Sequence, residues 1–552
     1  MSLKPQIFDP VPDETSRVAK AAFPNGNVYM QMRDAFGALY ADEAFAPLFS
    51  PRGQPGAAPA CLALVTVMQF AEGLSDRQAA NAVRGHIDWN ATRALGLELT
   101  DPGFDASVLS EFRSRLIAGQ AEAQLFELML TRFREAGLLK ARGQQRTDST
   151  HVLGAIHTLN RLECVGETLR RALNVLAVVA PDWLRAQVPP EWFDRYSRRF
   201  ENYRLPPGKP ERYALAETIG ADGFQLLRWV YATTTPAWVR QIPAVEVLRQ
   251  VWLQQFYASE QAVRWRVADD LPPSSIMICS PYDAEARYSK KRSTEWTGYR
   301  AHLTETCDEE WPHLITDVQT TPAPVSDFDM LPKIQADLAA RDVLPGEQIV
   351  DAGYVTADHL VSSQAKHGVT LVGPVNADPS WQAKAQQGFD VATFAIDWDQ
   401  QTATCPQGRT SALWMPGHDR HEHPVINIRF ARADCDTCAA RAKCTHSPAQ
   451  PRMITVRTRE QHEALQATRQ RQTTEAFKEQ YAQRAGIEGT ISQAVRTADL
   501  RRSRYLGLAK THLQNLITAA ALNLQRVADW LAERPLAQTR RSPFAALAAI
   551  NA

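Results

Sequence analysis

The sequence predicts a mixed α/β fold, and three observations support this class. Strand-like runs near residues 143–154 and 296–320 precede a helical run near 326–340, and an apolar strand, a helix and another strand follow within 348–374. Apolar runs of this length that alternate with helical patterns are typical of a mixed sheet covered by helices. The length of 552 residues adds room for about three to four domains of roughly 150 residues.

The composition excludes several classes of protein. Hydrophobic residues make up 44% and charged residues 22%, so the chain is globular and neither disordered nor fibrous. Because 61 Lys and Arg balance 61 Asp and Glu, binding of a polyanion depends on local patches. The longest apolar stretch, 57–71, is too short to cross a bilayer, and the first residues lack signal-peptide features. We expect a cytoplasmic protein that does not enter a membrane.

Residues 1–142 are predicted to form an all-helical domain. Ser75–Gln78 fits a capping box at the start of one helix, and Asp105–Ser107 fits the start of another. The second helix continues with Arg113 and Arg115 on its polar face. Such a face is often merely solvated, but it also suits a DNA-binding domain, which we expect here.

Two insertions are predicted to interrupt the α/β core, which comprises 143–154, 271–376 and 452–533. Residues 155–270 read as a helical insertion that holds six of the 13 Trp, a pattern that indicates a small core of its own more often than a base-stacking surface. Residues 377–451 form a Cys-rich insertion, and 534–552 form a C-terminal tail.

Three carboxylates are candidates for one active site. Asp351 follows an apolar strand directly, Asp148 is predicted to end an earlier strand, and Glu488 lies on a helix. Brought together, they could hold two Mg²⁺ ions about 3.5–4 Å apart and act on a phosphodiester. Each also has an ordinary interpretation: Asp148 as a turn cap, Asp351 as a turn residue before Gly353, and Glu488 as a solvated helix residue.

The helix that carries Glu488 also has features that suit DNA. Tyr481, Arg484 and Glu488 are spaced three and four residues apart, which places them on one helix face. Arg484 could bind a DNA phosphate, or form an ordinary helical pair with Glu488. A basic stretch that could follow a phosphate backbone comes next, although such runs are often only solvated faces; it contains Arg496, Arg501, Arg502, Arg504 and Lys510.

These motifs together resemble the DDE transposases of bacterial insertion sequences, and more narrowly the IS-eleven-eighty-two type. The resemblance rests on Asp148 in Thr-Asp-Ser-Thr, Asp351 in Val-Asp-Ala-Gly-Tyr and Glu488 in Tyr-x-x-Arg-x-x-x-Glu. Further support comes from segments 104–109, 281–288 with Gly298-Tyr299, and 504–510. The resemblance implies an RNase H-like catalytic core with a mixed sheet, a catalytic triad of Asp148, Asp351 and Glu488, dependence on a divalent metal, and cleavage with strand transfer at inverted repeats.

One position departs from this pattern. Related transposases with the Tyr-Arg-Glu helix carry a Lys seven residues after the Glu, whereas this chain has Val495 there and Arg496 next. The helical phase of Arg496 differs by about 100°, which puts its takeover of the phosphate contact in doubt. Asp283, Asp317 and Asp358 also lie near core strands, but they rank below the triad because none has a matching motif.

A separate group of cysteines points to a structural metal. Cys405, Cys435, Cys438 and Cys444 supply the four thiolates of a tetrahedral Zn²⁺ site, in a cytosolic context that disfavours disulfides. The separation between Cys405 and Cys435 is long, so a histidine could substitute as a ligand; the candidates are His446, His418, His421 and His423. Reduced, buried cysteines without metal are the alternative.

The sequence therefore predicts a transposase that binds double-stranded DNA at the inverted-repeat ends of its element and at a target. Mg²⁺ is the expected cofactor, with Mn²⁺ as a substitute and Zn²⁺ in a structural role, and the resemblance implies a homodimer on paired ends. Two alternatives stay open. One is a metal-dependent nuclease without strand transfer, and the other is an inactive DNA-binding protein derived from a transposase.

Overall fold

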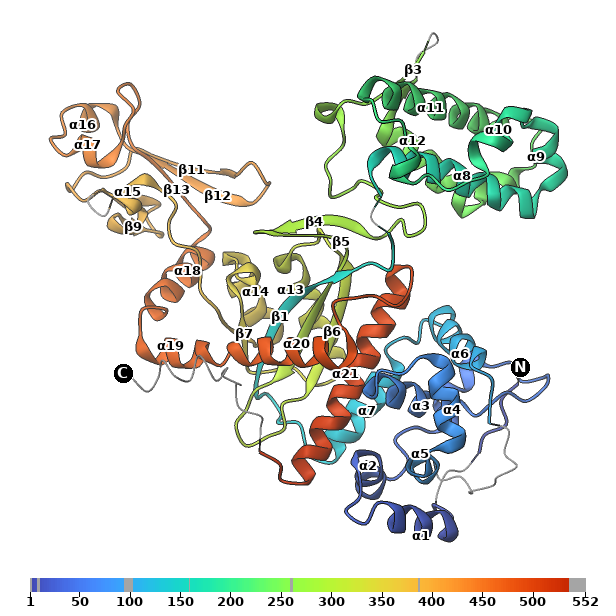
Figure 1. Cartoon of the computed structure of the whole chain (residues 1–552). Coiled ribbons are helices and arrows are strands. Elements are labelled where there is room, and N and C mark those ends of the chain that lie inside the picture. Colours follow the sequence, from blue (N-terminus) through green and yellow to red (C-terminus); the bar gives the residue numbers. More distant parts are fainter. Residues whose placement is uncertain are drawn as a thin grey trace, which may run out of the picture.

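A computed structural model of the chain describes residues 2–6, 10–93, 103–157, 159–258, 262–385 and 388–535. Most of the predicted tail, 536–552, therefore lies outside the described residues. No helix in the described part is long and apolar enough to cross a membrane. The predicted mixed α/β class is confirmed, because helices surround one mixed sheet at the centre of the molecule (Figure 1).

The central sheet brings strands together in the order β6-β5-β1-β7-β8, and β4 pairs with the first part of β5. β1 runs antiparallel to β5 but parallel to β7, and β7 runs parallel to β8, which makes the sheet mixed. The strands are β1 (Gln144–Leu153), β4 (Arg287–Lys291), β5 (Thr294–Thr306), β6 (Ile315–Pro322), β7 (Glu347–Val350) and β8 (Thr370–Val372).

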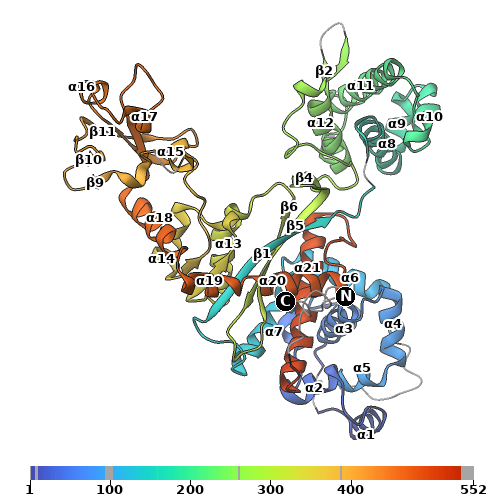
Figure 2. The ribbon, with the colours of Figure 1, turned by 60° about the vertical axis from the view of Figure 1, so that its left-hand side comes forward.

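Helices cover both faces of this sheet (Figures 1 and 2). α13 (Asp327–Ala340) and α14 (Ala357–His367) lie on one face, whereas α20 (Ala485–Ala498) and α21 (Leu508–Leu531) lie on the other. Side chains alternate along β1, so Arg146 contacts the α19–α20 junction and Ser149 contacts α13. Residues of even number on β1, Asp148 among them, therefore lie on the α20 side.

The N-terminal helices pack into a core that is continuous with the sheet and α21. Val67, Phe126, Val318 and Leu516 belong to one buried cluster. The predicted helix starts are confirmed: Ser75 and Gln78 form a capping box, and α6 begins at Ser107. The elements are α1 (Asp13–Ala22), α2 (Val28–Phe36), η1 (Asp42–Leu48), α3 (Pro59–Ala71), α4 (Asp76–Gly85), α5 (Ile87–Thr92), α6 (Ser107–Ala118) and α7 (Gln124–Glu135).

A helical lobe with its own buried core separates β1 from β5 in the sequence. Trp192 and Trp252 are buried in this core, whereas Trp238 is 48% exposed, so packing accounts for most of the local tryptophans. The elements are α8 (Arg161–Val179), α9 (Pro181–Gln187), α10 (Pro190–Tyr196), η2 (Asn202–Arg204), α11 (Lys209–Tyr231), η3 (Ala237–Gln241), α12 (Pro243–Gln255), β2 (Phe256–Ala258), β3 (Val263–Trp265) and η4 (Ala268–Asp270).

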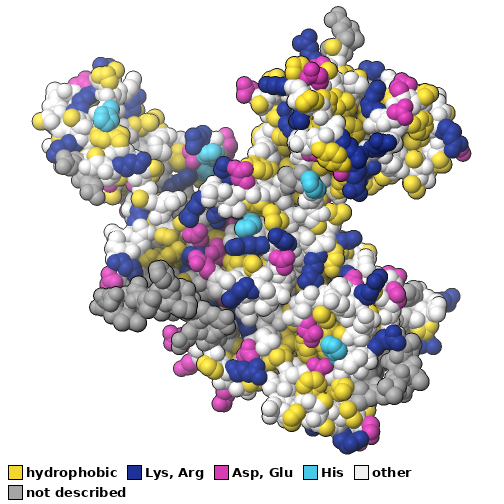
Figure 3. Space-filling view, in the orientation of Figure 1, with side chains coloured by type: hydrophobic (Ala, Val, Ile, Leu, Met, Phe, Trp, Pro, Cys, Tyr) yellow, Lys and Arg dark blue, Asp and Glu magenta, His cyan; other side chains and the backbone are white. Residues whose placement is uncertain are grey.

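The cysteine-bearing segment forms a second lobe around Phe394, Phe430 and Ile454. The two lobes project from the core with an open gap between them (Figure 3). The elements of this lobe are α15 (Trp381–Lys384), η6 (Val391–Thr393), β9 (Ala395–Asp397), β10 (Thr402–Thr404), β11 (Leu413–His418), β12 (Pro424–Arg429), α16 (Arg432–Asp436), α17 (Arg441–Cys444) and β13 (Met453–Val456). α18 (Arg459–Arg471) then leads back to the core.

Candidate active site

Asp148 and Asp351 lie side by side in the sheet. The last paired residues of β1 and β7 are Thr147 and Val350, so each aspartate directly follows this pair at one edge of the parallel ladder. One expectation was wrong: Asp148 does not end its strand, because β5 continues to pair with β1 as far as Leu153. Asp148 instead marks the point at which β1 loses its partner β7, which leaves space beside its side chain.

Asp351 begins the short turn η5 (Ala352–Tyr354). Its side chain accepts a hydrogen bond from the Ala352 amide at 2.8 Å. The ordinary interpretation of Asp351 as a turn residue is thus correct for its local role, but this role leaves carboxylate capacity for another ligand.

The predicted single helix from Tyr481 to Glu488 is broken in two. α19 (Glu475–Ala482) ends before Gln483, and α20 begins at Ala485. Across the break the Arg484 amide donates to the Tyr481 carbonyl at 3.0 Å, which is a tighter i→i+3 bond. Tyr481 and Arg484 nevertheless remain neighbours, with the guanidinium 5.9 Å from the ring centroid.

Arg484 joins two of the three predicted carboxylates. Its Nη1 lies 2.8 Å from Asp148 Oδ2, and its Nη2 lies 2.5 Å from Glu488 Oε1. The side chains of Arg484 and Asp148 are 18% and 13% exposed, whereas that of Glu488 is 61% exposed. A strand residue and a helix residue that are far apart in the sequence therefore meet at one guanidinium.

The electrostatic environment ties Asp351 to the same place. Burial raises the pKa of Asp148, and the nearby Asp351 carboxylate adds to the rise, whereas Arg484 opposes it. Burial also raises the pKa of Tyr481, with further contributions from Asp351 and Asp148. Asp148 thus lies near both Asp351 and Tyr481, and Arg484 links Asp148 to Glu488, so the three carboxylates belong to one acidic region.

Comparison with protein families found two matches. A family model described as "Transposase DDE domain" matches residues 404–528, and one described as "Transposase domain (DUF772)" matches residues 17–115. Both matched segments of the chain are similar to transposase domains, which supports a DDE transposase. No curated protein matches the chain.

The two matches cover different parts of the chain. The DDE match contains Arg484, Glu488 and all four clustered cysteines, and the other match covers the N-terminal helices as far as α6. Asp148 and Asp351 lie outside both matches, so the structure, rather than the family comparison, is what places them near each other and links Asp148 to Glu488 through Arg484. A DDE domain implies an RNase H-like core, with which the mixed central sheet agrees.

The side chains of the basic stretch are exposed, and Arg501 brings the stretch next to the site. Arg501 donates from Nε to Thr150 Oγ1 at 3.0 Å, on the face of β1 that also carries Asp148. Arg504 donates to the Leu74 carbonyl at 3.3 Å and lies over the Phe70 ring. Arg496 turns back to the Ser492 carbonyl at 3.3 Å. Arg502 and Lys510 complete the exposed group.

A buried network behind the site was not predicted from the sequence. Asp327, the first residue of α13, accepts from Ser149 Oγ at 2.8 Å and from Arg300 Nη1 at 2.9 Å. Next to it, His302 Nδ1 lies 2.7 Å from the Tyr354 hydroxyl. Burial acts to raise the pKa of Asp327, but Arg300 holds this pKa below its usual value. The anionic Asp327 therefore supports β1 directly behind Asp148. The serine-aspartate pair at the start of its helix was the sequence signal that could have revealed this residue.

The four clustered cysteines line one small cavity. Cys405 follows β10 in a turn where its sulfur accepts the Arg409 amide at 3.4 Å, and Cys435 lies in α16. Burial raises the pKa of Cys444 to about 11, and the other three thiols contribute. None of the proposed substitute histidines lines this cavity: His446 packs on Trp381, and the other three belong to the β11–β12 hairpin.

Neither the acidic site nor the cysteine cavity is arranged as a preformed metal site. Among the described residues, no three or more His, Cys, Asp or Glu side chains form a group that could hold a metal ion as placed. In the acidic site, Arg484 occupies the position between Asp148 and Glu488. The chemistry of both donor sets still suits a metal: carboxylate oxygens suit Mg²⁺ and thiolates suit Zn²⁺.

Proposed function

We propose that this DDE transposase cleaves DNA at the inverted-repeat ends of an insertion sequence of the IS-eleven-eighty-two type and joins the freed 3′ ends to target DNA. The observation that carries the proposal is that Arg484 contacts both Asp148 and Glu488, while Asp351 lies next to Asp148 at the edge of the parallel ladder. An isolated acidic residue has many roles, but carboxylates from three distant parts of the chain near one arginine at a sheet edge suit phosphodiester chemistry.

The three carboxylates would hold two Mg²⁺ ions, with Mn²⁺ as a substitute. Bound metal would supply a nucleophilic hydroxide or alkoxide at neutral pH and stabilise charge on the leaving oxygen. Asp148 is well placed for this role because burial limits its solvation and favours a close positive charge. Glu488, being more exposed, lies on the solvent side of the site, from which DNA would approach.

The residues around the carboxylates would hold the DNA backbone. Arg484 has the planar guanidinium that binds phosphate oxygens in pairs, and Tyr481 lies against it. Arg501 contacts Thr150 on the face of β1 that carries Asp148. The proposed backbone contacts are Tyr481, Arg484, Arg496, Arg501, Arg502, Arg504 and Lys510.

The N-terminal helices would bind the inverted repeat. Support comes from the transposase-domain match over residues 17–115 and from the core that these helices share with α21. That shared core fixes the helices to the catalytic sheet, so DNA bound to them would be held at a constant distance from the carboxylates. The gap between the two lobes leaves space for DNA beside the core (Figure 3).

We also propose that Cys405, Cys435, Cys438 and Cys444 hold one structural Zn²⁺. Their common cavity and the reduced state of all four thiols support this proposal. A bound Zn²⁺ would convert the thiols to thiolates and lock the lobe that connects β8 to α18, which otherwise has a small core.

Incubation of the purified protein with labelled DNA that carries its element's end tests the cleavage proposal. Mg²⁺ or Mn²⁺ should give discrete cleavage at the end on a denaturing gel, and EDTA should abolish it. Asp351→Asn should abolish cleavage and leave end binding intact, whereas Asp358→Asn, the same change at an exposed residue of α14, should cleave normally. Cleavage by Asp351→Asn at the wild-type rate would overturn the site assignment.

Precleaved ends offered together with a target plasmid separate a transposase from the two alternatives. Joined products establish strand transfer, whereas cleavage without joining identifies a nuclease. Specific binding without either reaction identifies an inactive DNA-binding protein. Light scattering of the protein with and without end DNA tests the proposed homodimer, which should appear on paired ends.

A further inference from the structure

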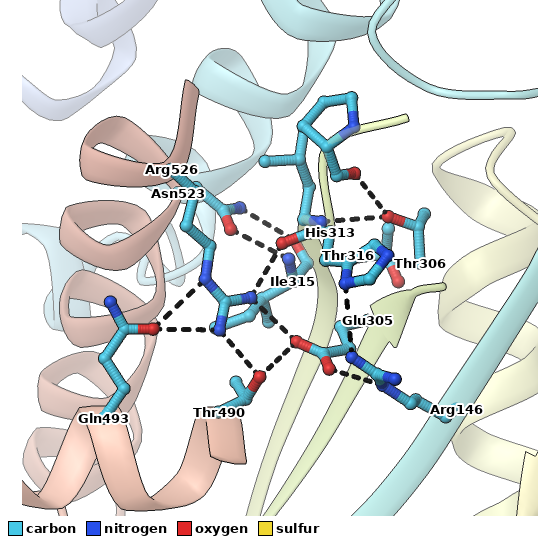
Figure 4. A network of polar contacts seen from close by, with 12 residues as sticks. Arg146, Glu305, Thr306, His313, Ile315, Thr316, Thr490, Gln493, Asn523 and Arg526 are labelled. Atoms are coloured by element: carbon cyan, nitrogen blue, oxygen red, sulfur yellow. Dashed lines mark hydrogen bonds and ion pairs between the residues drawn. The ribbon is translucent and has the colours of Figure 1, made fainter. Parts of the chain in front are cut away.

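A buried ion pair lies between the sheet and the helix that carries Glu488. Arg146 of β1 donates from Nε to Glu305 Oε1 of β5 at 2.6 Å, and Glu305 is fully buried (Figure 4). Although burial acts to raise it, Arg526 and Arg146 hold the pKa of Glu305 below its usual value, so this residue is a buried anion. The attraction within a buried charged pair rarely exceeds the free-energy cost of removing both charges from water. Stability alone therefore does not explain this pair, and we asked which groups it positions.

The pair holds α20 on both sides of Glu488. Arg146 Nη1 donates to the Gln483 carbonyl at 2.8 Å, five residues before Glu488. Glu305 Oε2 accepts from Thr490 Oγ1 at 2.5 Å, two residues after Glu488, and from Arg526 of α21 at 2.7 Å. The segment that carries Glu488 is therefore attached to the sheet at both of its ends, and Figure 4 shows the attachment at Thr490.

Arg146 also accounts for the break between α19 and α20. Its guanidinium lies so close to the backbone that a Cβ added to Gly486 would be 1.9 Å from Nη1. The Gln483 carbonyl accepts from this guanidinium, and the neighbouring backbone bonds are of the i→i+3 type. A side chain at residue 486 would displace this guanidinium, so glycine permits the close approach of Arg146 to the helix.

We propose that Arg146 and Glu305 are positioning residues that set Glu488 against Asp148, an inference that rests on the proposed function. Arg146 and Asp148 are two positions apart on one face of β1, so a single strand supplies one carboxylate and the anchor for another. Glu488 is largely exposed and contacts Arg484, so the placement of its carboxylate depends on where α20 lies. The pair thereby fixes the third carboxylate without touching DNA or metal.

Two glycines of α20 provide a matched test. Gly486→Ala forces the Arg146 guanidinium away from the helix, whereas Gly489→Ala adds the same methyl group into open space one residue after Glu488. Both proteins are compared with wild type for circular dichroism, thermal unfolding, binding of end DNA, Mn²⁺ binding by isothermal titration, and single-turnover cleavage at saturating DNA.

Gly486→Ala should bind end DNA like wild type but bind Mn²⁺ about tenfold more weakly and cleave about tenfold or more slowly. Gly489→Ala should match wild type in DNA binding, Mn²⁺ binding and cleavage, and should unfold at the same or a slightly higher temperature because alanine favours a helix. Glu305→Gln, which keeps the volume but removes the charge that fixes Arg146 and Thr490, should repeat the loss and serves as the second variant if Gly486→Ala does not fold.

The outcomes separate the two proposals. If Asp148→Asn is inactive and both folded variants bind Mn²⁺ and cleave like wild type, the positioning role is overturned and the proposed function stands. If wild type does not cleave, the proposed function fails. In that case, weaker Mn²⁺ binding by Gly486→Ala than by Gly489→Ala still supports the positioning role, and equal binding overturns it.

Discussion

Arg484 donates to Asp148 across 2.8 Å, so a guanidinium from the C-terminal helices neutralises a carboxylate from the first strand of the sheet. The same guanidinium reaches Glu488, which makes it the link between the two parts of the acidic site. Its loss should therefore be felt in the stability of the protein as well as in its activity.

Arg484→Gln should lower the free energy of unfolding by about 1–3 kcal/mol in EDTA at pH 8, because Asp148 stays partly buried without its cation. Burial already raises the pKa of Asp148, so the folded state binds a proton more tightly than the unfolded state. Stability therefore falls as the pH rises, and the deficit should be smaller at pH 5 than at pH 8. Urea unfolding at pH 5 and pH 8 measures this deficit in stability. Arg185→Gln, the same change at an exposed arginine, serves as the control.

Asp327→Asn should destabilise the protein by about 2–4 kcal/mol, because it leaves Arg300, which is only 11% exposed, without a partner charge. Asp329→Asn changes an exposed residue two positions along α13 and should have little effect. Thermal and urea unfolding compare the two variants. Equal stability of both would show that Arg300 and Ser149 do not depend on the Asp327 charge.

His512 should make the protein less stable in acid. Burial, with Lys333 and Arg341 nearby, lowers the pKa of His512 from 6.5 to about 4. The unfolded chain therefore binds this proton first, and stability is lost as the pH falls from about 6.5 toward 4, by at most about 3 kcal/mol. Replacement by Asn should flatten this slope. The same change at exposed His418 should preserve the slope of stability against pH. An unchanged slope in His512→Asn would contradict the prediction.

Zinc analysis of the purified protein should find about one Zn²⁺ per chain. Cys438→Ser should release the metal and lower the melting temperature of the cysteine-bearing lobe, because one of the four thiols that line the cavity is lost. Cys279→Ser removes a cysteine outside this cavity and should keep the metal. If the full-length protein without zinc is as stable as the metal-loaded form, the four cysteines are only packed side chains.

Features that depend on neighbouring residues could be predicted from the sequence. The capping box at Ser75 and the strands that lead to Asp148 and Asp351 follow from local spacing, and the structure contains them. The side-by-side placement of the two aspartates is a finding of the structure, in which β1 and β7 run parallel and pair as far as Thr147 and Val350.

Features that depend on distant residues could not be predicted. The break before Glu488 lies where the guanidinium of Arg146, a residue distant in the sequence, binds the helix backbone. This guanidinium occupies the space that a side chain at Gly486 would fill. Helical spacing alone favours an unbroken helix there. Asp327 has no catalytic motif, and only the fold places it behind Asp148. The continuity of strand β1 past Asp148 likewise depends on its partner β5.

The shared core of α3 and α21 has a consequence for synthesis of the protein. The buried side chains of α3 have partners on α21, a helix that is made long after α3 because it lies far along the chain. Until then this apolar helix face lacks that partner, and a chain that terminates before α21 would expose it to aggregation and proteolysis. Synthesis of α21 therefore determines when the N-terminal helices reach their final packing.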